Sequence, residues 1–130
     1  MTRIYLIYAY DETSKFYQKS VDLFVNEEYN LFITTKNISE FFAVCSKLNF
    51  DFDKTLGFYN DIKENFTILK PSESSLDFFE TLIKKYKPRG NKVYDIEIVS
   101  IMLTNDLKKV ATANIIDFKD ISEIEIIEIC

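Results

Sequence analysis

The chain has 130 residues, 47% hydrophobic and 15% aromatic, with a formal net charge of −5, which suits one soluble domain with its own core. No histidine is present, which excludes Ser-His and Cys-His catalysis, zinc fingers and the usual zinc hydrolases. The two glycines, Gly57 and Gly90, are too few for the phosphate-binding loops of P-loop and dinucleotide-binding folds.

The first half of the chain alternates predicted strands with predicted helices. Ile4–Tyr10 is continuously apolar, which predicts a strand buried on both faces, and an amphipathic helix follows from Asp11 to about Glu27. A second strand is expected at Leu31–Thr35. Thr35 or Asn37 can cap the next helix. The apolar residues of that helix are Ile38, Phe41, Phe42, Val44, Cys45 and Leu48.

The second half continues the alternation. The predicted elements are a helix at Asp53–Glu64, a strand at Phe66–Leu69, a helix from Ser72 to the break at Pro88, a helix at Val93–Thr104, and strands at Val110–Ala113 and Glu123–Ile129. Helices alternating with strands predict an α/β fold with right-handed crossovers. We expect a three-layer α/β/α sandwich with a mostly parallel central sheet, formed by a single domain over residues 1–130.

The cellular setting is inferred from what the sequence lacks. The apolar run Ile4–Tyr10 is too short to cross a bilayer and is not followed by a signal-peptide cleavage pattern. Cys45 and Cys130 belong to no C-x-x-C pair, so both are expected to be free thiols, with Cys45 packed in the core. These features predict a cytoplasmic location.

Carboxylate chemistry remains possible, because the chain has 21 Asp and Glu residues that could hold Mg²⁺ or Mn²⁺. In Val93–Thr104, the residues Glu97, Ser100 and Thr104 form one polar stripe, and Asp95 lies roughly opposite. A carboxylate on a buried face is costly unless it is paired, hydrogen-bonded or metal-bound. Asp95 is therefore the first candidate functional residue; the alternative is a helix-terminal role, since Asp favours the first turn.

Three other polar residues are candidates by position. Asn114 and Asp117 follow the predicted strand Val110–Ala113, and ligands of open α/β sheets collect at the carboxyl ends of strands. Both residue types are also common in turns. Glu40 lies near the edge of its helix's polar stripe, and this pattern alone favours a solvated side chain.

Four segments, read together and in order, carry a family resemblance. They are Tyr8–Glu12, Ile38–Phe41, Lys92–Asp95 and Thr112–Phe118. Ile38–Phe41 looks like a Ser-Glu-Phe helix that carries a second acid, and Thr112–Phe118 looks like a Thr-x-Asn/Asp-x-x-Asp-Phe motif. In this arrangement the chain resembles the PIN domain family, which includes the VapC-type toxin ribonucleases, over nearly its whole length.

The departure from that family is at the N-terminus, where PIN domains have Asp-Thr-Asn or Asp-Thr-Ser after the first strand. Counting back from Ala9 without a gap places the family's first acid at Thr2, which leaves no room for a first strand. Deletion of the turn instead leaves Arg3–Ile7 as that strand. We prefer the deletion because Ile4–Tyr10 has the pattern of a buried strand. Asp11 would then lie near its carboxyl end and substitute for the missing acid.

The resemblance implies a cage of carboxylates that holds one or two Mg²⁺ or Mn²⁺ ions. Glu40 and Asp95 would be its principal ligands, Asn114 and Asp117 would bind directly or through water, and Asp11 would complete it. The implied function is a metal-dependent endoribonuclease, the toxin of a toxin–antitoxin pair, acting on RNA, bound by an antitoxin protein and assembled as a homodimer. The alternative is a catalytically degenerate PIN-like module that binds RNA or protein.

A basic cluster immediately precedes Asp95 and consists of Lys84, Lys85, Lys87, Arg89 and Lys92. We expect four of its members, Lys85, Lys87, Arg89 and Lys92, to contact an RNA backbone. The alternative is a solvated helix end, because lysines near a helix C-terminus also complement the helix dipole. The acidic net charge disfavours tight non-specific binding of nucleic acid.

Overall fold

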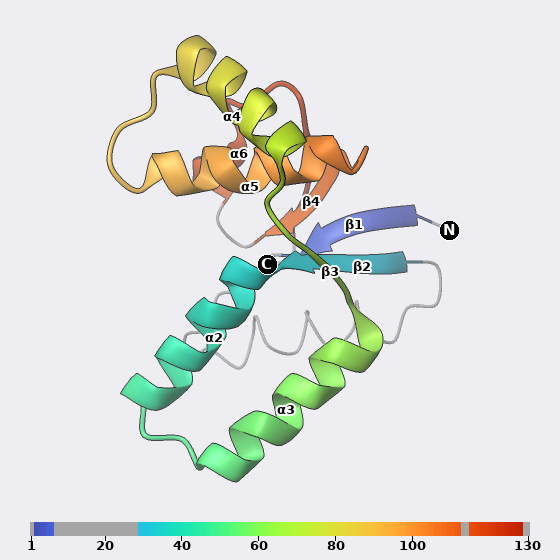
Figure 1. Cartoon of the computed structure of the whole chain (residues 1–130), viewed down its shortest axis with the longest axis vertical. Coiled ribbons are helices and arrows are strands. Elements are labelled where there is room, and N and C mark those ends of the chain that lie inside the picture. The colour runs from blue at the N-terminus through green and yellow to red at the C-terminus, as the bar shows by residue number, and fades with distance from the viewer. Residues whose placement is uncertain (1, 7–28, 113–114, 129–130) are drawn as a thin grey trace.

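The computed structural model describes residues 2–6, 29–112 and 115–128 (Figure 1). Five strands form one sheet in the order β3-β2-β1-β4-β5, and every neighbouring pair is parallel. The strands are β1 (Thr2–Leu6), β2 (Tyr29–Thr34), β3 (Thr67–Leu69), β4 (Lys109–Thr112) and β5 (Glu125–Glu128). The predicted parallel α/β fold is confirmed.

Five helices are described: α2 (Thr35–Lys47), α3 (Phe52–Asn65), α4 (Glu73–Tyr86), α5 (Lys92–Thr104) and the short α6 (Ile115–Phe118). The α2–α3 pair projects on one side of the sheet, and α4 packs along α5 on the other (Figure 1). The sequence patterns predicted α2 to α5, with bounds that differ by one or two residues, but did not predict α6.

Alternate residues of β2 show how the sheet is buried on both faces. Leu31 and Ile33 pack in one core cluster with Ile62 and Phe66, at the end of α3. Phe32, between them, packs in a second cluster formed largely by α5 and β4, with Ile98, Ile101, Met102 and Val110. Since successive strand residues point to opposite faces, helical residues cover both sides of the sheet.

Helix α2 begins with a capping arrangement that the sequence did not predict correctly. The cap is neither Thr35 nor Asn37 but Thr34, whose hydroxyl accepts from the backbone N–H of Asn37 at 3.4 Å. In return Asn37 Oδ1 accepts from the Thr34 N–H at 2.9 Å. Both side chains are buried, 1% and 2% exposed. This reciprocal pair fixes the direction in which the chain leaves β2 and enters α2.

Two other helix starts carry side-chain caps. Asp51 accepts from the Lys54 N–H at 3.0 Å and caps α3. Ser72 and Ser75 form a capping box at the start of α4. Helix α4 ends at Lys87, which has a positive φ of 48° and lies directly before Pro88.

The polar stripe of α5, formed by Glu97, Ser100 and Thr104, lies partly inside the protein. Ser100 is 1% exposed, and its hydroxyl donates to the carbonyl of Ile96 at 2.7 Å. Thr104 likewise donates to the carbonyl of Ser100 at 2.8 Å. Both hydroxyls are satisfied within the helix, which lets α5 pack as a central element with polar residues inside.

The remaining predictions concern the N-terminal segment, the two cysteines and membrane spans. Strand β1 begins at Thr2 and pairs with β2 and β4, which supports a strand over the first residues. The rest of the predicted strand to Tyr10, the helix Asp11–Glu27 and Cys130 lie outside the described residues. Cys45 is a buried free thiol, as expected, and burial raises its pKa. None of the helices within the described ranges is both long enough and apolar enough to cross a membrane.

Candidate functional site

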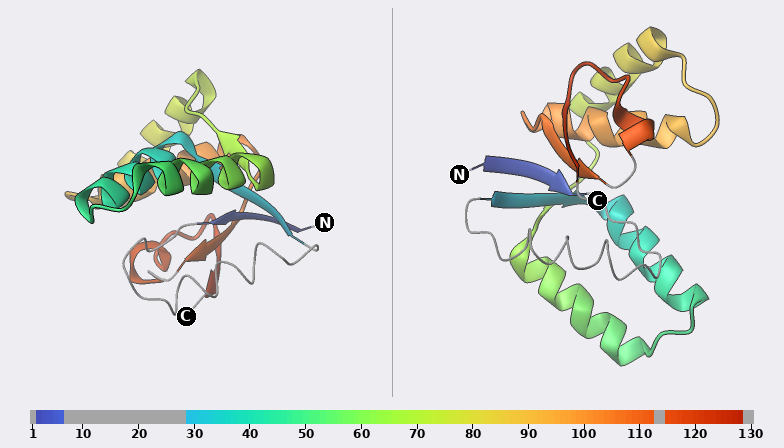
Figure 2. Two further views of the ribbon diagram at one scale, coloured as in Figure 1. Left: turned by 90° about the horizontal axis from the view of Figure 1, so that it is seen from below. Right: turned by 180° about the vertical axis from the view of Figure 1, so that it is seen from behind.

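The candidate site lies at the carboxyl ends of the parallel strands. The chain passes from β1 to β2 on one side of the sheet, whereas β4 pairs with β1 on the other, so the strand order reverses at β1. Crevices at such a reversal are the usual ligand sites of open α/β sheets. The arrowheads of β1 and β2 point toward the side of the molecule where α2 begins and α6 lies (Figure 2).

Asp95 lies in the first turn of α5 and is half-buried. The N-cap position belongs to Asn91, which makes no side-chain cap bond, so capping does not account for Asp95. Within the described part of the chain, no hydrogen-bond donor meets its carboxylate. A partly desolvated carboxylate without donors is unfavourable in its charged form.

The electrostatics of Asp95 show which charged groups surround it. Its pKa is raised from 3.8 to about 6, first by burial and then by the negative charge of Asp117, with a smaller contribution from Glu40. The ammonium groups of Lys92 and Lys36 oppose this rise. Three separate helices therefore bring Glu40, Asp95 and Asp117 into one electrostatic environment, which we call the acidic cluster. Asn114 and Asp11 lie outside the described residues.

Lys36, which follows β2 at the start of α2, was not among the functional residues predicted from the sequence. Its Nζ is buried, lies 3.5 Å from the centroid of the Tyr94 ring, and has no hydrogen-bond partner among the described residues. Tyr94 directly precedes Asp95. The available signal was the spacing of Lys36 and Glu40, four residues apart on one helix face.

The acidic cluster fits a hard divalent cation in the kind of donor it offers. Its side chains supply only carboxylate oxygens, the ligands that Mg²⁺ and Mn²⁺ prefer, and the ionised form of Asp95 is destabilised by burial and by the charge of Asp117. Among the described residues no three acids or cysteines are grouped closely enough to hold an ion by themselves. Asp11 and Asn114 are the further ligands that the sequence predicts.

Of the four predicted RNA-contacting residues, Lys85 has a structural partner. Its ammonium pairs with Glu123 at 2.7 Å, and the hydroxyl of Tyr86 donates to the same carboxylate. Burial raises the pKa of Glu123, but these two hydrogen bonds, together with a backbone hydrogen bond and the charge of Lys85, lower it below its usual value. Lys87 and Arg89 are exposed, and Lys92 is half-buried beside Asp95. Their contact with RNA stays a prediction.

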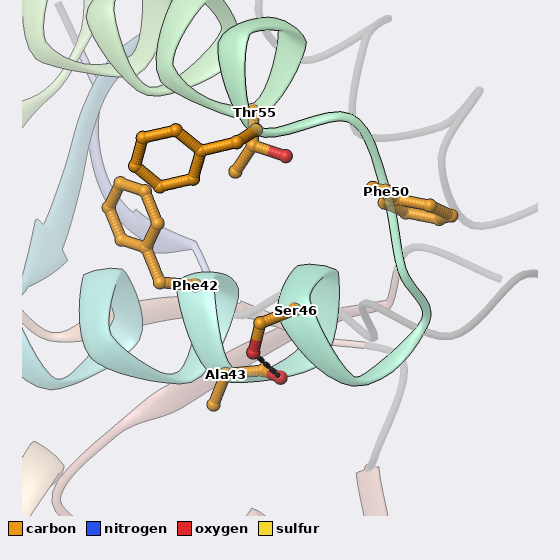
Figure 3. A pocket seen from close by; sticks show the side chains of 6 residues that line it. Phe42, Ala43, Ser46, Phe50 and Thr55 are labelled. Atoms are coloured by element: carbon orange, nitrogen blue, oxygen red, sulfur yellow. Dashed lines mark hydrogen bonds between the residues drawn. The ribbon is translucent and has the colours of Figure 1, made fainter.

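A second surface feature is an apolar hollow of about 280 Å³ between α2 and α3 (Figure 3). It is lined by Phe42, Ala43, Ser46, Phe50, Phe52 and Thr55. Phe50, in the loop that joins the helices, is 55% exposed, and Phe52 is 67% exposed. No lining residue is ionisable, so the hollow offers apolar contact and no acid–base or metal chemistry.

Comparison with known proteins identifies the fold. No protein-family model and no curated protein matches the sequence. Solved structures match it over almost their full length. A chain of the VapBC-1 structure from nontypeable Haemophilus influenzae is 16% identical, with 98% of each chain covered and a TM-score of 0.73. A chain of the DNA-bound VapBC structure from Salmonella typhimurium is 17% identical, with 100% of each chain covered and a TM-score of 0.70.

The third match is a chain of VapBC2 from Rickettsia felis, bound to a DNA fragment from its promoter. It is 17% identical, with 96% of this chain and 98% of that chain covered and a TM-score of 0.65. At such identities the likeness establishes the architecture alone. Taken with the ordered sequence motifs and the all-parallel sheet, it shows that the chain adopts the PIN-domain fold.

Proposed function

We propose that this chain is a PIN-type endoribonuclease that uses Mg²⁺ or Mn²⁺ at the acidic cluster. The observation that carries the proposal is Asp95, a half-buried carboxylate without a hydrogen-bond donor among the described residues, whose pKa is raised by burial and by Asp117 and Glu40. A group destabilised in this way, at the carboxyl edge of a parallel sheet, is a typical functional carboxylate.

In this proposal Glu40, Asp95, Asp117, Asn114 and Asp11 together form the ligand set of the metal. The bound ion would supply an activated water and stabilise the charge that develops on the attacked phosphodiester. The chain's own contribution is to hold carboxylates from three helices at one edge of the sheet. The cations of Lys87, Arg89 and Lys92 would hold the RNA backbone next to Asp95.

We further propose that the chain is the toxin of a toxin–antitoxin pair and forms a homodimer. All three solved structures described above contain VapBC proteins, and their matching chains are covered almost completely. The exposed apolar surface around the α2–α3 hollow also favours a protein partner, because large exposed apolar side chains are commonly covered in complexes.

The second candidate function is a PIN-like module that binds RNA or protein without cleavage. Two observations favour it: the first-strand Asp-Thr-Asn element is missing, and two ammonium groups, those of Lys36 and Lys92, lie in the field of the acidic cluster. Both features reduce the negative charge available to a metal ion.

Cleavage of a labelled single-stranded RNA separates the two candidates. The wild type should cleave in Mn²⁺ and not in chelator, and Asp95→Asn should lose cleavage. Asp77→Asn is the matched control, because Asp77 is an exposed carboxylate early in α4. Asp11→Ala should lose as much activity as Asp95→Asn if Asp11 replaces the missing acid. A folded wild type no more active than Asp95→Asn would instead identify the non-cleaving module.

A further inference from the structure

Lys36 is the charged residue that the packing of the fold explains least. Its ammonium is buried and, among the described residues, has no hydrogen-bond acceptor, although a lysine carries three donors. Burying a charged donor without an acceptor is unfavourable. One compensating contact is the face of the Tyr94 ring, whose centroid is 3.5 Å from Nζ.

The cost of burying the Lys36 ammonium is also offset by charge interactions. Lys36 and Glu40 are one helical turn apart on α2, and the charge of Lys36 also acts on Asp95. Lys92 is the other cation in this environment. Three carboxylates and two ammonium groups leave the ionised site with a single net negative charge, so the two cations offset part of the repulsion among the acids.

We propose that Lys36 is the built-in counter-ion of the acidic cluster. Held against Tyr94, its ammonium stabilises the ionised forms of Glu40 and Asp95 when no metal is bound, and it repels an incoming divalent cation. The first part of this inference concerns the metal-free protein, and the second part rests on the proposed function. A metal site with its own cation folds without metal and binds metal more weakly than its carboxylates alone would.

The first part is tested by a double-mutant cycle in chelator. Thermal midpoints are measured for the wild type, Lys36→Met, Asp95→Asn and the double variant. Lys36→Met removes the charge while keeping a similar apolar stem, so it should lower the midpoint in the wild type by roughly 3 °C or more. It should lower the midpoint much less in the Asp95→Asn background, where the cluster has one charge fewer.

Two further variants control for packing. Lys36→Arg keeps the positive charge and should behave like the wild type. Lys63→Met removes an exposed lysine whose Nζ is 5.5 Å from the ring of Tyr59 on α3, so it removes a positive charge and a weaker ring contact far from Asp95 in sequence. Equal effects of Lys36→Met in both backgrounds, or a loss in Lys36→Arg as large as in Lys36→Met, would overturn the counter-ion role.

The second part is tested by Mn²⁺ titration, followed by thermal shift and by calorimetry. Lys36→Met should bind Mn²⁺ about tenfold more tightly than the wild type, because a unit positive charge beside the ion has been removed. Weaker or equal binding by Lys36→Met would overturn the proposed competition. Charge coupling in chelator with no Mn²⁺ binding by any variant would uphold the counter-ion role and refute the proposed metal-dependent function instead.

Discussion

Replacing Asp95 by Asn is expected to stabilise the metal-free protein at neutral pH. The folded-state pKa of Asp95 is raised from 3.8 to about 6, so the native state binds its proton more tightly than the unfolded chain does. Between these two pKa values the native state holds the extra proton, and stability falls as pH rises through the interval. Above about pH 6 the full penalty of the ionised carboxylate is present, and Asn removes it.

The magnitude follows from the size of the shift. A rise from 3.8 to about 6 corresponds to about 3 kcal/mol at about 1.4 kcal/mol per pKa unit. Because Asp95 is only half-buried, solvent screening reduces this to about 1 kcal/mol, or roughly 3 °C in the thermal midpoint of a domain of this size. Below about pH 4 both states are protonated, and the two proteins should be nearly equally stable.

Urea unfolding followed by circular dichroism measures this difference, since the chain has no tryptophan for fluorescence. In chelator at about pH 7.5 the Asn variant should be more stable than the wild type, and at about pH 4 the difference should vanish. Asp77→Asn should show no such pH-dependent gain. Saturating Mn²⁺ should reverse the order, because an ion at 100 times its Kd adds about 2.7 kcal/mol to the wild type alone. An Asn variant less stable than the wild type in chelator at neutral pH would refute the reasoning.

Three other predictions concern stability. Phe118→Ala should destabilise the protein by about 3 kcal/mol or more in urea unfolding, because Phe118 is 2% exposed in the core beside α5; a loss below about 1 kcal/mol would show that the site repacks. Ser72→Ala should lower the free energy of unfolding by about 1 kcal/mol, because the capping box is lost. Asn91→Ala removes no cap bond and should lower it less. Thermal melts that rank the two variants the other way would contradict this. Tyr94→Leu should cost about 1 kcal/mol by removing the aromatic face over Lys36, and an unchanged midpoint would show that this contact contributes nothing.

The fold was predictable from sequence wherever a local pattern and the final packing agree. Helix α5 is apolar almost all round, and it is the central helix, with Ile96 and Val99 at 0% exposure. The start of α4 at Ser72 follows from the Pro-Ser signal. The start of α2 was harder, because Thr34, Thr35 and Asn37 are all good capping residues and only the geometry at the end of β2 selects Thr34. Helix α6 is a single turn, too short for a periodic pattern.

The sequence selects Glu40, Asp95 and Asp117 as candidate ligands, a role that stays a prediction, whereas it did not single out Lys36. Asp95 stood out because a carboxylate among apolar residues conflicts with helix packing, and the ordered motifs then selected Glu40 and Asp117. Lys36 gave no such signal, since a lysine on a polar helix stripe is normally solvated. Its contact with Tyr94, which is far away in the sequence, depends on the sheet order that brings α2 and α5 together. Long-range placement of this kind is not encoded in any local pattern.

The acidic cluster also provides a criterion for function that does not depend on finding the substrate. A carboxylate kept only for structure should stabilise the fold, so its removal should be destabilising under all conditions. A carboxylate kept for a ligand is destabilising when the ligand is absent, and its removal should stabilise the empty protein while abolishing the response to the ligand. The proposed function predicts that Asp95, with a raised pKa and no donor among the described residues, behaves as the second kind. The burial of the Lys36 ammonium then has a physical reason. Its positive charge offsets part of the repulsion among the carboxylates of the acidic cluster when no metal is bound.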